Sequence, residues 1–326
     1  MRTTYLGLEL RSPIMVASSP FTADALRIVQ CARHGAGAVV LRSVFEEQIV
    51  RQAESLASPY IGRGDAGEYL ERYLGDQYLT QHLQLIDAAR ETDIPVIASI
   101  NCIAGSERWV DYASALERAG ASALEVNIFL QPTNRHLTAA ALEQSYTETV
   151  GAVTDAVAIP VAVKLSPRFT NLLAVADGLL AHGARGAVLF NRFFEPDIDI
   201  DRMQFRLSPP YSEPSELRGV LRSVALCASA VPQLDLAVST GVHDGEGAVK
   251  ALLCGARAVQ LCTAIQRYGY EIIGTVDAFI DRWAERQGFE SLEEFRGRMD
   301  YGHAGGAAWQ RTQYLRYYRT LAEPVG

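Results

Sequence analysis

The sequence predicts an α/β protein with a (β/α)8 TIM barrel, because two short phrases alternate along the chain. In the first phrase a helix ends at a Gly-Ala pair and an apolar strand follows, and the glycine fits the left-handed position after a helix. In the second phrase Ile-Pro-Val opens a strand, since proline is tolerated at a strand's first residue. The second phrase occurs at 94–96 and 159–161. The first occurs at Gly35, Gly120, Gly183 and Gly255.

Looser copies of the second phrase at 12–16 and 232–236 complete a set of eight strands. Helical stretches separate most of them, which is typical of a parallel barrel. An open doubly wound sheet would place a glycine fingerprint in its first β–α turn, and the Ala-Ser-Ser-Pro sequence at 17–20 is no such fingerprint. We therefore expect one barrel domain over residues 1–326. Its strands are expected at 14–18, 37–42, 95–100, 122–127, 160–165, 186–191, 234–239 and 257–262.

Three segments exceed a minimal barrel: an insertion at about 44–84, a second at about 192–215, and a C-terminal helical extension at about 270–326. Both insertions leave from C-terminal strand ends, so we expect them to cover the face where barrels carry their chemistry. The extension predicts an amphipathic helix over 272–287 and a capping box formed by Ser291 and Glu294. Its aromatic end is expected to pack on the barrel through Trp309, Tyr314, Tyr317 and Tyr318.

Composition narrows the class of protein. Hydrophobic residues make up 48% of the chain and charged residues 21%, the balance of a globular protein with a large core. The net charge of −8 argues against a nucleic-acid partner or an anionic membrane surface. No apolar run approaches the length of a membrane span, and the five cysteines show neither metal nor disulfide spacing. A cytoplasmic protein with no metal and no membrane partner is expected.

The stretch 234–265 reads as strand, glycine-bearing turn, helix and strand. Neighbouring parallel strands end at the same edge, so the backbone N–H groups of Thr240-Gly241 and Cys262-Thr263 should lie close together. Such a cluster of donors binds phosphate, and the loops after the last two barrel strands are where this site usually lies. The alternative is that Thr240-Gly241 forms only a tight turn.

Lys164 lies on an otherwise apolar strand, and a buried ammonium needs a partner or a role. It could form a structural ion pair, form a Schiff base with a carbonyl substrate, or stabilise negative charge on a cofactor. Asn127 and Asn191 end two further strands that, as buried barrel strands, should carry no polar group. Two amides, a lysine and a phosphate site suit flavin mononucleotide (FMN), although a phosphosugar would also use the lysine and the phosphate site.

The chain resembles the soluble class of the dihydroorotate dehydrogenase family in a set of residues that occur in the same order. They are Ser12-Pro13 before the first strand, Asn127, the sequence Val-Lys-Leu at 163–165, Asn191 and the 234–265 unit. The resemblance covers roughly residues 3 to 300. It implies that FMN lies over the barrel mouth, that Lys164 faces the N1/O2 edge of the flavin, and that Asn127 and Asn191 contact flavin and substrate. These three are the expected catalytic residues.

The resemblance also implies the remaining cofactor contacts and the cellular setting. Hydride would pass between flavin N5 and the CH–CH bond of a small cyclic substrate, as in pyrimidine biosynthesis. The soluble class is typically a cytoplasmic homodimer without an N-terminal membrane helix. The further residues expected at the cofactor are Ala17, Ser18, Arg42, Ser43, Thr240, Gly241, Cys262 and Thr263.

The departures from the family lie on the substrate side. Arg42 stands where the family has a lysine, and a guanidinium is not an equivalent substitute. The family's Asn-Ser-Met-Gly-Leu-x-Asn substrate loop is absent from 44–84, and Leu-Ser-Pro-Pro at 207–210 replaces a glycine-rich phosphate contact. Leu130 occupies the position of the family's general base, and leucine cannot take a proton. The nearby candidates for that role are Thr133, His136 and Cys102.

Three functions remain open at this point. The first is an FMN oxidoreductase of this family, acting on a substrate that need not be dihydroorotate. The second is a Schiff-base lyase or aldolase that uses Lys164 on a phosphorylated substrate. The third is a flavin-binding protein without turnover, which the missing base would explain.

Overall fold

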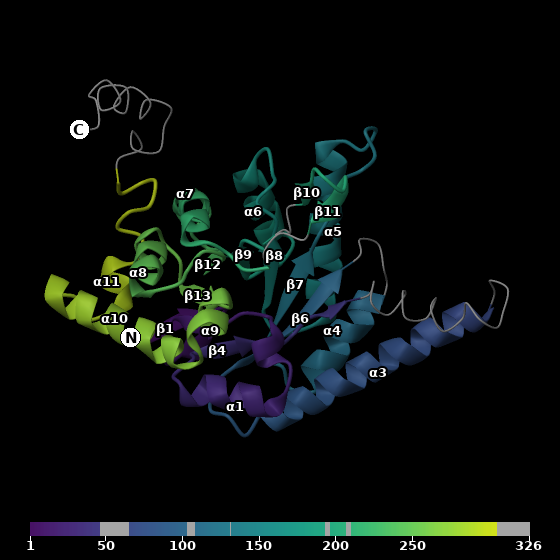
Figure 1. The fold of residues 1–326 in the computed structure, drawn as a ribbon, viewed down its shortest axis with the longest axis horizontal. Coiled ribbons are helices and arrows are strands. Elements are labelled where there is room, and N and C mark those ends of the chain that lie inside the picture. The colour runs from purple at the N-terminus through teal and green to yellow at the C-terminus, as the bar shows by residue number, and fades with distance from the viewer. Residues whose placement is uncertain (46–64, 103–107, 131, 193–195, 207–209, 305–326) are drawn as a thin grey trace.

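The computed structural model describes residues 1–45, 65–102, 108–130, 132–192, 196–206 and 210–304, and its centre is a closed barrel of parallel strands (Figure 1). The barrel closes because β13 pairs with β3 and β4 pairs with β6. Each predicted strand is found, shortened or shifted by a few residues. The strands are β3 (Ile14–Val16), β4 (Ala38–Val40), β6 (Val96–Cys102), β7 (Ala123–Ile128), β8 (Val161–Leu165), β9 (Gly186–Leu189), β12 (Asp235–Ser239) and β13 (Ala258–Leu261).

Helices connect and surround these strands. The predicted glycines after four of the helices have φ angles of 96°, 96°, 88° and 112°, so the left-handed stop that placed the strands is confirmed. In Figure 1, α10 lies beside α8 on one side of the barrel and α3 lies beside α4 on the other. The helices are α1 (Ala25–Arg33), α3 (Asp65–Ala89), α4 (Arg108–Arg118), α5 (Ala139–Ala156), α6 (Leu172–Ala181), α7 (Leu217–Ala230), α8 (Gly245–Leu253), α9 (Thr263–Tyr268), α10 (Glu271–Gln287) and α11 (Leu292–Phe295), with the 3₁₀ turns η1 (Pro20–Thr22) and η2 (Pro214–Glu216).

The N-terminal hairpin closes the end of the barrel at which the strands begin. Its strands β1 (Thr3–Tyr5) and β2 (Leu8–Leu10) place Tyr5 and Leu10 among small interior residues such as Ala123 and Ala258. Asp235, at the start of β12, accepts a hydrogen bond from the Leu6 N–H at 2.7 Å and lies 2.6 Å from Arg257 Nε. Burial, and then the carboxylates of Glu125 and Asp235, raise the pKa of Tyr5 well above its usual value. The barrel interior is therefore apolar where the strands begin, and polar side chains lie nearer the C-terminal ends of the strands.

The predicted insertions have partly regular structure. β5 (Val44–Phe45) pairs with β6, and residues 65–84 belong to α3, which leads from β4 to β6. The second insertion contains the antiparallel hairpin of β10 (Asp197–Asp199) and β11 (Gln204–Arg206). Two of the predicted departures from the family involve residues outside the described ones. The missing substrate loop concerns 46–64 in part, and the replaced glycine-rich phosphate contact concerns 207–209.

The C-terminal extension begins with the predicted amphipathic helix, which is α10. The predicted capping box at Ser291 is wrong in detail: the Ser291 hydroxyl donates to Glu294 Oε1 at 3.0 Å and makes no hydrogen bond to the backbone of α11. The carboxylate of Glu294 accepts instead from the Glu290 N–H. The aromatic residues from Trp309 onward lie outside the described residues. Within the described part of the chain, no helix is long and apolar enough to cross a membrane.

Candidate active site at the barrel mouth

A buried polar cluster occupies the barrel interior below the mouth. Lys164 Nζ donates to Gln260 Oε1 at 2.9 Å and lies 3.5 Å from Glu125 Oε1, while Gln260 Nε2 donates to Glu125 Oε2 at 2.5 Å. The three residues are 6%, 2% and 1% exposed. They come from β8, β13 and β7, so their side chains meet across the barrel axis. Among the described residues Lys164 thus makes one hydrogen bond, to Gln260, and one ion pair, with Glu125, and its ammonium has donor capacity left for a ligand.

The sequence analysis identified Lys164 but missed its two partners. A signal was present, because side chains two residues apart on a strand face the same side. Glu125 lies two residues before Asn127, and Gln260 lies two before Cys262. The pattern cannot predict that Gln260 and Glu125, which are 135 residues apart in sequence, form a hydrogen bond.

The Lys164–Glu125 pair yields a stability prediction. Glu125→Leu is expected to destabilise the fold by about 3–5 kcal/mol, because it leaves an ammonium buried without its carboxylate. Lys164→Met/Glu125→Leu should recover much of that loss, since both buried charges are removed. Urea unfolding of the ligand-free protein, followed by circular dichroism, measures both changes. Strictly additive effects would show that the two side chains do not interact energetically.

Amide side chains form a second layer next to this cluster, nearer the C-terminal ends of the strands. Asn191 Nδ2 donates to Asn127 Oδ1 at 3.2 Å, so the structure brings together the two predicted asparagines beside Lys164, whose strand pairs with that of Asn127. Asn101 Oδ1, on β6, is buried and has no hydrogen-bond partner among the described residues. A cleft of about 530 Å³ adjoins this layer and is lined in part by Asn191 and Thr240. The layer thus presents amide groups to a ligand.

Hydroxyl groups line the side of the mouth near β3 and β4. Ser18 Oγ lies 3.0 Å from Ser43 Oγ, which in turn lies 2.7 Å from Ser99 Oγ. The Ala17 N–H donates to the Leu261 carbonyl at 2.9 Å, which ties the end of β3 to β13. Arg42 is exposed at its side chain, and its carbonyl accepts from His82 Nε2 at 2.5 Å. Of the two residues predicted after the second strand, Ser43 is therefore buried and Arg42 is at the surface.

The two strand ends predicted to bind phosphate are neighbours, since β12 and β13 pair in parallel. Thr240 has a φ of 78°, unusual for a β-branched residue, and its hydroxyl donates to the Phe190 carbonyl at 3.1 Å. At Gly241, with a φ of 81°, a Cβ would lie 2.5 Å from the Leu217 nitrogen at the start of α7. The turn is thus strained and closely packed. Such strain is often found at functional sites and is held by the surrounding structure.

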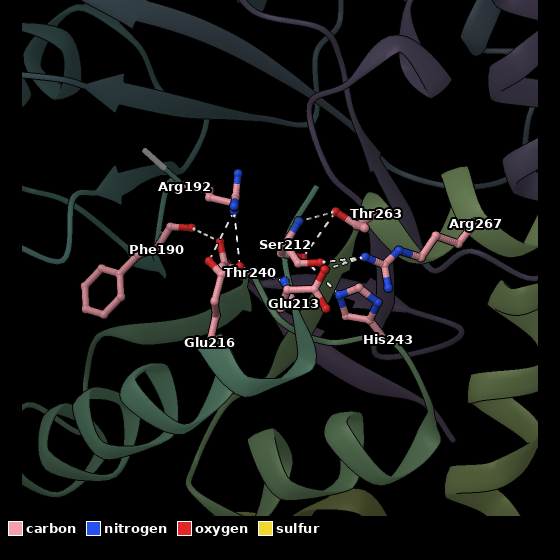
Figure 2. A network of polar contacts seen from close by, with 9 residues as sticks. All are labelled: Phe190, Arg192, Ser212, Glu213, Glu216, Thr240, His243, Thr263 and Arg267. Atoms are coloured by element: carbon pink, nitrogen blue, oxygen red, sulfur yellow. Dashed lines mark hydrogen bonds and ion pairs between the residues drawn. The ribbon is translucent and has the colours of Figure 1, made fainter. Parts of the chain in front are cut away.

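A hydrogen-bonded group that the sequence analysis missed lies beside these strand ends (Figure 2). Ser212, from the second insertion, contacts both Thr263 and His243, and all three are buried. Burial, and then the nearby Arg267 guanidinium, hold the pKa of His243 below its usual value. Burial raises the pKa of the Cys262 thiol, against the opposing effects of Lys164 and a hydrogen bond with Ser19.

The candidates for a general base lie apart from this layer. Leu130 is half-buried and lines a cavity of about 230 Å³ with Tyr146 and Phe169, on the flank between α5 and the end of β8. Thr133 and His136 are exposed on the loop before α5. The side chain of Cys102 lies outside the described residues. Among the residues that are described, no group of three His, Cys, Asp or Glu side chains is arranged to hold a metal ion.

Comparison with known proteins finds relatives that match along most of the chain. The chain is 28% identical over 315 residues to the dihydroorotate dehydrogenase B (NAD(+)) catalytic subunit of Methanothermobacter thermautotrophicus, covering 91% of this chain and 97% of that protein. It is 25% identical over 309 residues to the protein of that name from Thermoplasma volcanium, at 90% and 97% coverage. It is 23% identical over 325 residues to the chloroplastic dihydropyrimidine dehydrogenase (NADP(+)) of Arabidopsis thaliana, at 91% and 76% coverage.

These matches define an oxidoreductase built on a parallel barrel. The family model for dihydroorotate dehydrogenase matches residues 1–282, so the chain belongs to the dihydroorotate dehydrogenase family. The resemblance read from the sequence is confirmed.

Proposed function

We propose that this protein is an FMN-dependent oxidoreductase that transfers hydride between the flavin and the CH–CH bond of a small cyclic substrate other than dihydroorotate. The observation that carries the proposal is Lys164, buried in the barrel interior below the mouth, where Glu125 and Gln260 hold it next to the amides of Asn127 and Asn191. Members of the family are FMN-dependent flavoproteins. The catalytic roles of Lys164, Asn127 and Asn191 are part of this proposal.

The described residues fit FMN in both charge and donor type. A flavin ring needs hydrogen-bond donors and acceptors in one plane and a cation near the edge that becomes negative on reduction. Asn101 Oδ1 offers a buried acceptor without a partner, and Lys164 offers the cation. The adjoining ends of β12 and β13 offer the backbone donors that a phosphate needs.

The protein groups have separate tasks in this reaction. When bound, FMN supplies the ring that accepts or donates the hydride. Lys164 places a fixed positive charge in a site with little water, where it acts far more strongly than in solution. Asn127 and Asn191, which are hydrogen-bonded to each other, orient flat polar groups of flavin and substrate.

The substrate is proposed to differ from dihydroorotate because the residues that would serve that substrate are displaced or changed. Leu130 cannot take a proton, and the Arg42 side chain is exposed. One protein similar to this chain is named dihydropyrimidine dehydrogenase, and a dihydropyrimidine is also a ring with a CH–CH bond to oxidise or reduce. We also propose a small-molecule substrate, a cytoplasmic location and a homodimer, as in the soluble class that the sequence resembles.

Bound FMN is the first testable consequence. The purified protein is expected to show oxidised-flavin absorbance and to release FMN on denaturation, identified by its mass and by its separation from riboflavin. A colourless protein that does not take up added FMN would contradict the proposal. If such a protein were trapped by borohydride together with a phosphorylated carbonyl compound, the Schiff-base lyase would be supported instead.

A further inference from the structure

Three buried hydroxyl and imidazole groups form a chain beside the paired ends of β12 and β13. His243 Nε2 lies 3.0 Å from Ser212 Oγ, and Ser212 Oγ lies 3.1 Å from Thr263 Oγ1 (Figure 2). His243, Ser212 and Thr263 are 5%, 4% and 9% exposed. They come from the loop before α8, the segment before η2 and the start of α9. Three segments far apart in sequence therefore meet in one water-poor place.

The order of the hydrogens in this chain follows from counting donors and acceptors. The Ser212 N–H, which can only donate, donates to Thr263 Oγ1 at 3.2 Å. If the Ser212 hydroxyl donates to the same oxygen, both lone pairs of Thr263 are engaged and its own hydrogen must point to another acceptor. Ser212 Oγ then accepts from the Nε2–H of His243. The reverse order would leave Nδ1–H of His243 as a buried donor, and that nitrogen has no partner among the described residues.

The segment that carries Ser212 is held firmly. Arg267 Nη2 donates to the Ser212 carbonyl at 3.4 Å and to Glu213 Oε1 at 2.8 Å. The Glu213 N–H donates to Glu216 Oε1 at 2.6 Å, and Glu216 Oε2 lies 3.1 Å from Arg192 Nε. The carboxylates of Glu213 and Glu216 are thus paired with cations, which limits their repulsion of an anion. The third carboxylate near His243, that of Asp244, accepts from the Gly247 N–H at 2.8 Å. The low pKa of His243 keeps its imidazole neutral near pH 7, so this residue supplies direction and no charge.

We propose that His243 and Ser212 are positioning residues that fix the Thr263 hydroxyl as a donor to the phosphate of the bound nucleotide, so that the site selects FMN over dephosphorylated riboflavin. This inference rests on the proposed function, because it takes FMN as the ligand. Thr263 lies directly after Cys262 at the end of β13, and His243 follows the Thr240-Gly241 turn by two residues. Both therefore lie where the backbone donors for a phosphate converge.

The test compares two ligands that differ only in the phosphate. Dissociation constants of the flavin-free protein for FMN and for riboflavin are measured by flavin fluorescence quenching. Thr263→Val is expected to weaken FMN binding about 10–100-fold, as is typical for loss of a hydrogen bond to a charged group. Ser212→Ala and His243→Leu are each expected to weaken it about 3–10-fold, as for a neutral hydrogen bond. Riboflavin binding should change less than about twofold in all three, an expectation set below the effect of one neutral hydrogen bond.

Coupling within the chain and a matched control sharpen the test. His243→Leu should add little to Ser212→Ala, because the Thr263 hydroxyl has already lost its fixed direction. Thr3→Val removes another buried hydroxyl, which donates to the Arg257 carbonyl at 3.1 Å at the far end of the barrel, and should leave the ratio of the two affinities unchanged. Circular dichroism checks the fold of each variant. If His243→Leu does not fold, Ser212→Ala alone decides.

Each outcome bears on a different claim. A wild-type affinity ratio in Ser212→Ala, or an equal loss for both flavins, would overturn the inference and leave the proposed function standing. Binding of neither flavin by the wild-type protein would overturn the proposed function and this inference with it. Weaker FMN binding with unchanged riboflavin binding supports the positioning role, provided that the effects of Ser212→Ala and His243→Leu are also non-additive.

Discussion

Lys164→Met is expected to lower the rate of flavin reduction by a hydride donor about 10²–10³-fold, the usual effect of losing one group that stabilises developing charge. Lys164 is a buried cation in the barrel interior below the mouth, and methionine keeps much of its volume without the charge. The substitution also leaves the buried Glu125 carboxylate without its cation, and its negative charge would oppose reduction of a flavin bound at the barrel mouth. Stopped-flow absorbance at the flavin band measures the rate, and because the substrate is not assigned, a reduced nicotinamide serves as the hydride donor.

The Lys164→Met/Glu125→Leu double variant separates the two contributions. It removes the unpaired carboxylate, so its rate is expected to lie above that of Lys164→Met and below that of the wild type. Its stability is also closer to the wild type, which guards against reading a folding defect as a loss of rate. Wild-type rates and flavin affinities in both variants would show that Lys164 serves only to pair with Glu125.

The barrel could be predicted from the sequence because its strands are delimited by local signals. The glycines at the ends of four helices and the proline at the strand starts act through the backbone of a few neighbouring residues. Such signals need no knowledge of the rest of the chain. The same holds for Lys164, Asn127 and Asn191, which are polar residues at or near the ends of predicted barrel strands.

The partners of these residues could not be predicted in the same way. Gln260 and Glu125 meet only once the barrel has closed with a particular register between its strands. Ser212 reaches Thr263 from an insertion 51 residues away. The capping box at Ser291 failed for a related reason: its residue types were right, but the Ser291 hydroxyl bonds to the Glu294 carboxylate and not to the helix backbone. Residue type and spacing do not decide which of several acceptors is nearest.

Weak or no oxidation of dihydroorotate is expected even with FMN fully bound. A proton must leave carbon as hydride passes to the flavin, and a positioned base contributes about 10²–10⁴-fold to such a step. Leu130 takes the place of that base and lines a flanking cavity with Tyr146 and Phe169. The alternatives Thr133 and His136 are exposed on the following loop. The Arg42 side chain is also exposed, so the family's lysine has no counterpart there.

The assay follows dihydroorotate consumption with fumarate, NAD⁺ and a dye as acceptors, in protein with a measured flavin content. Photoreduction of the same sample, followed by reoxidation with the dye, shows that the bound flavin is active and that the fault lies with the substrate. Leu130→Cys restores a group that can exchange a proton, yet it is expected to leave turnover low, because that position packs on the flank of the barrel and the Arg42 change remains. Steady wild-type turnover of dihydroorotate at rates usual for an enzyme, about 1–10³ s⁻¹, would show that a base is present and that the substrate assignment is wrong.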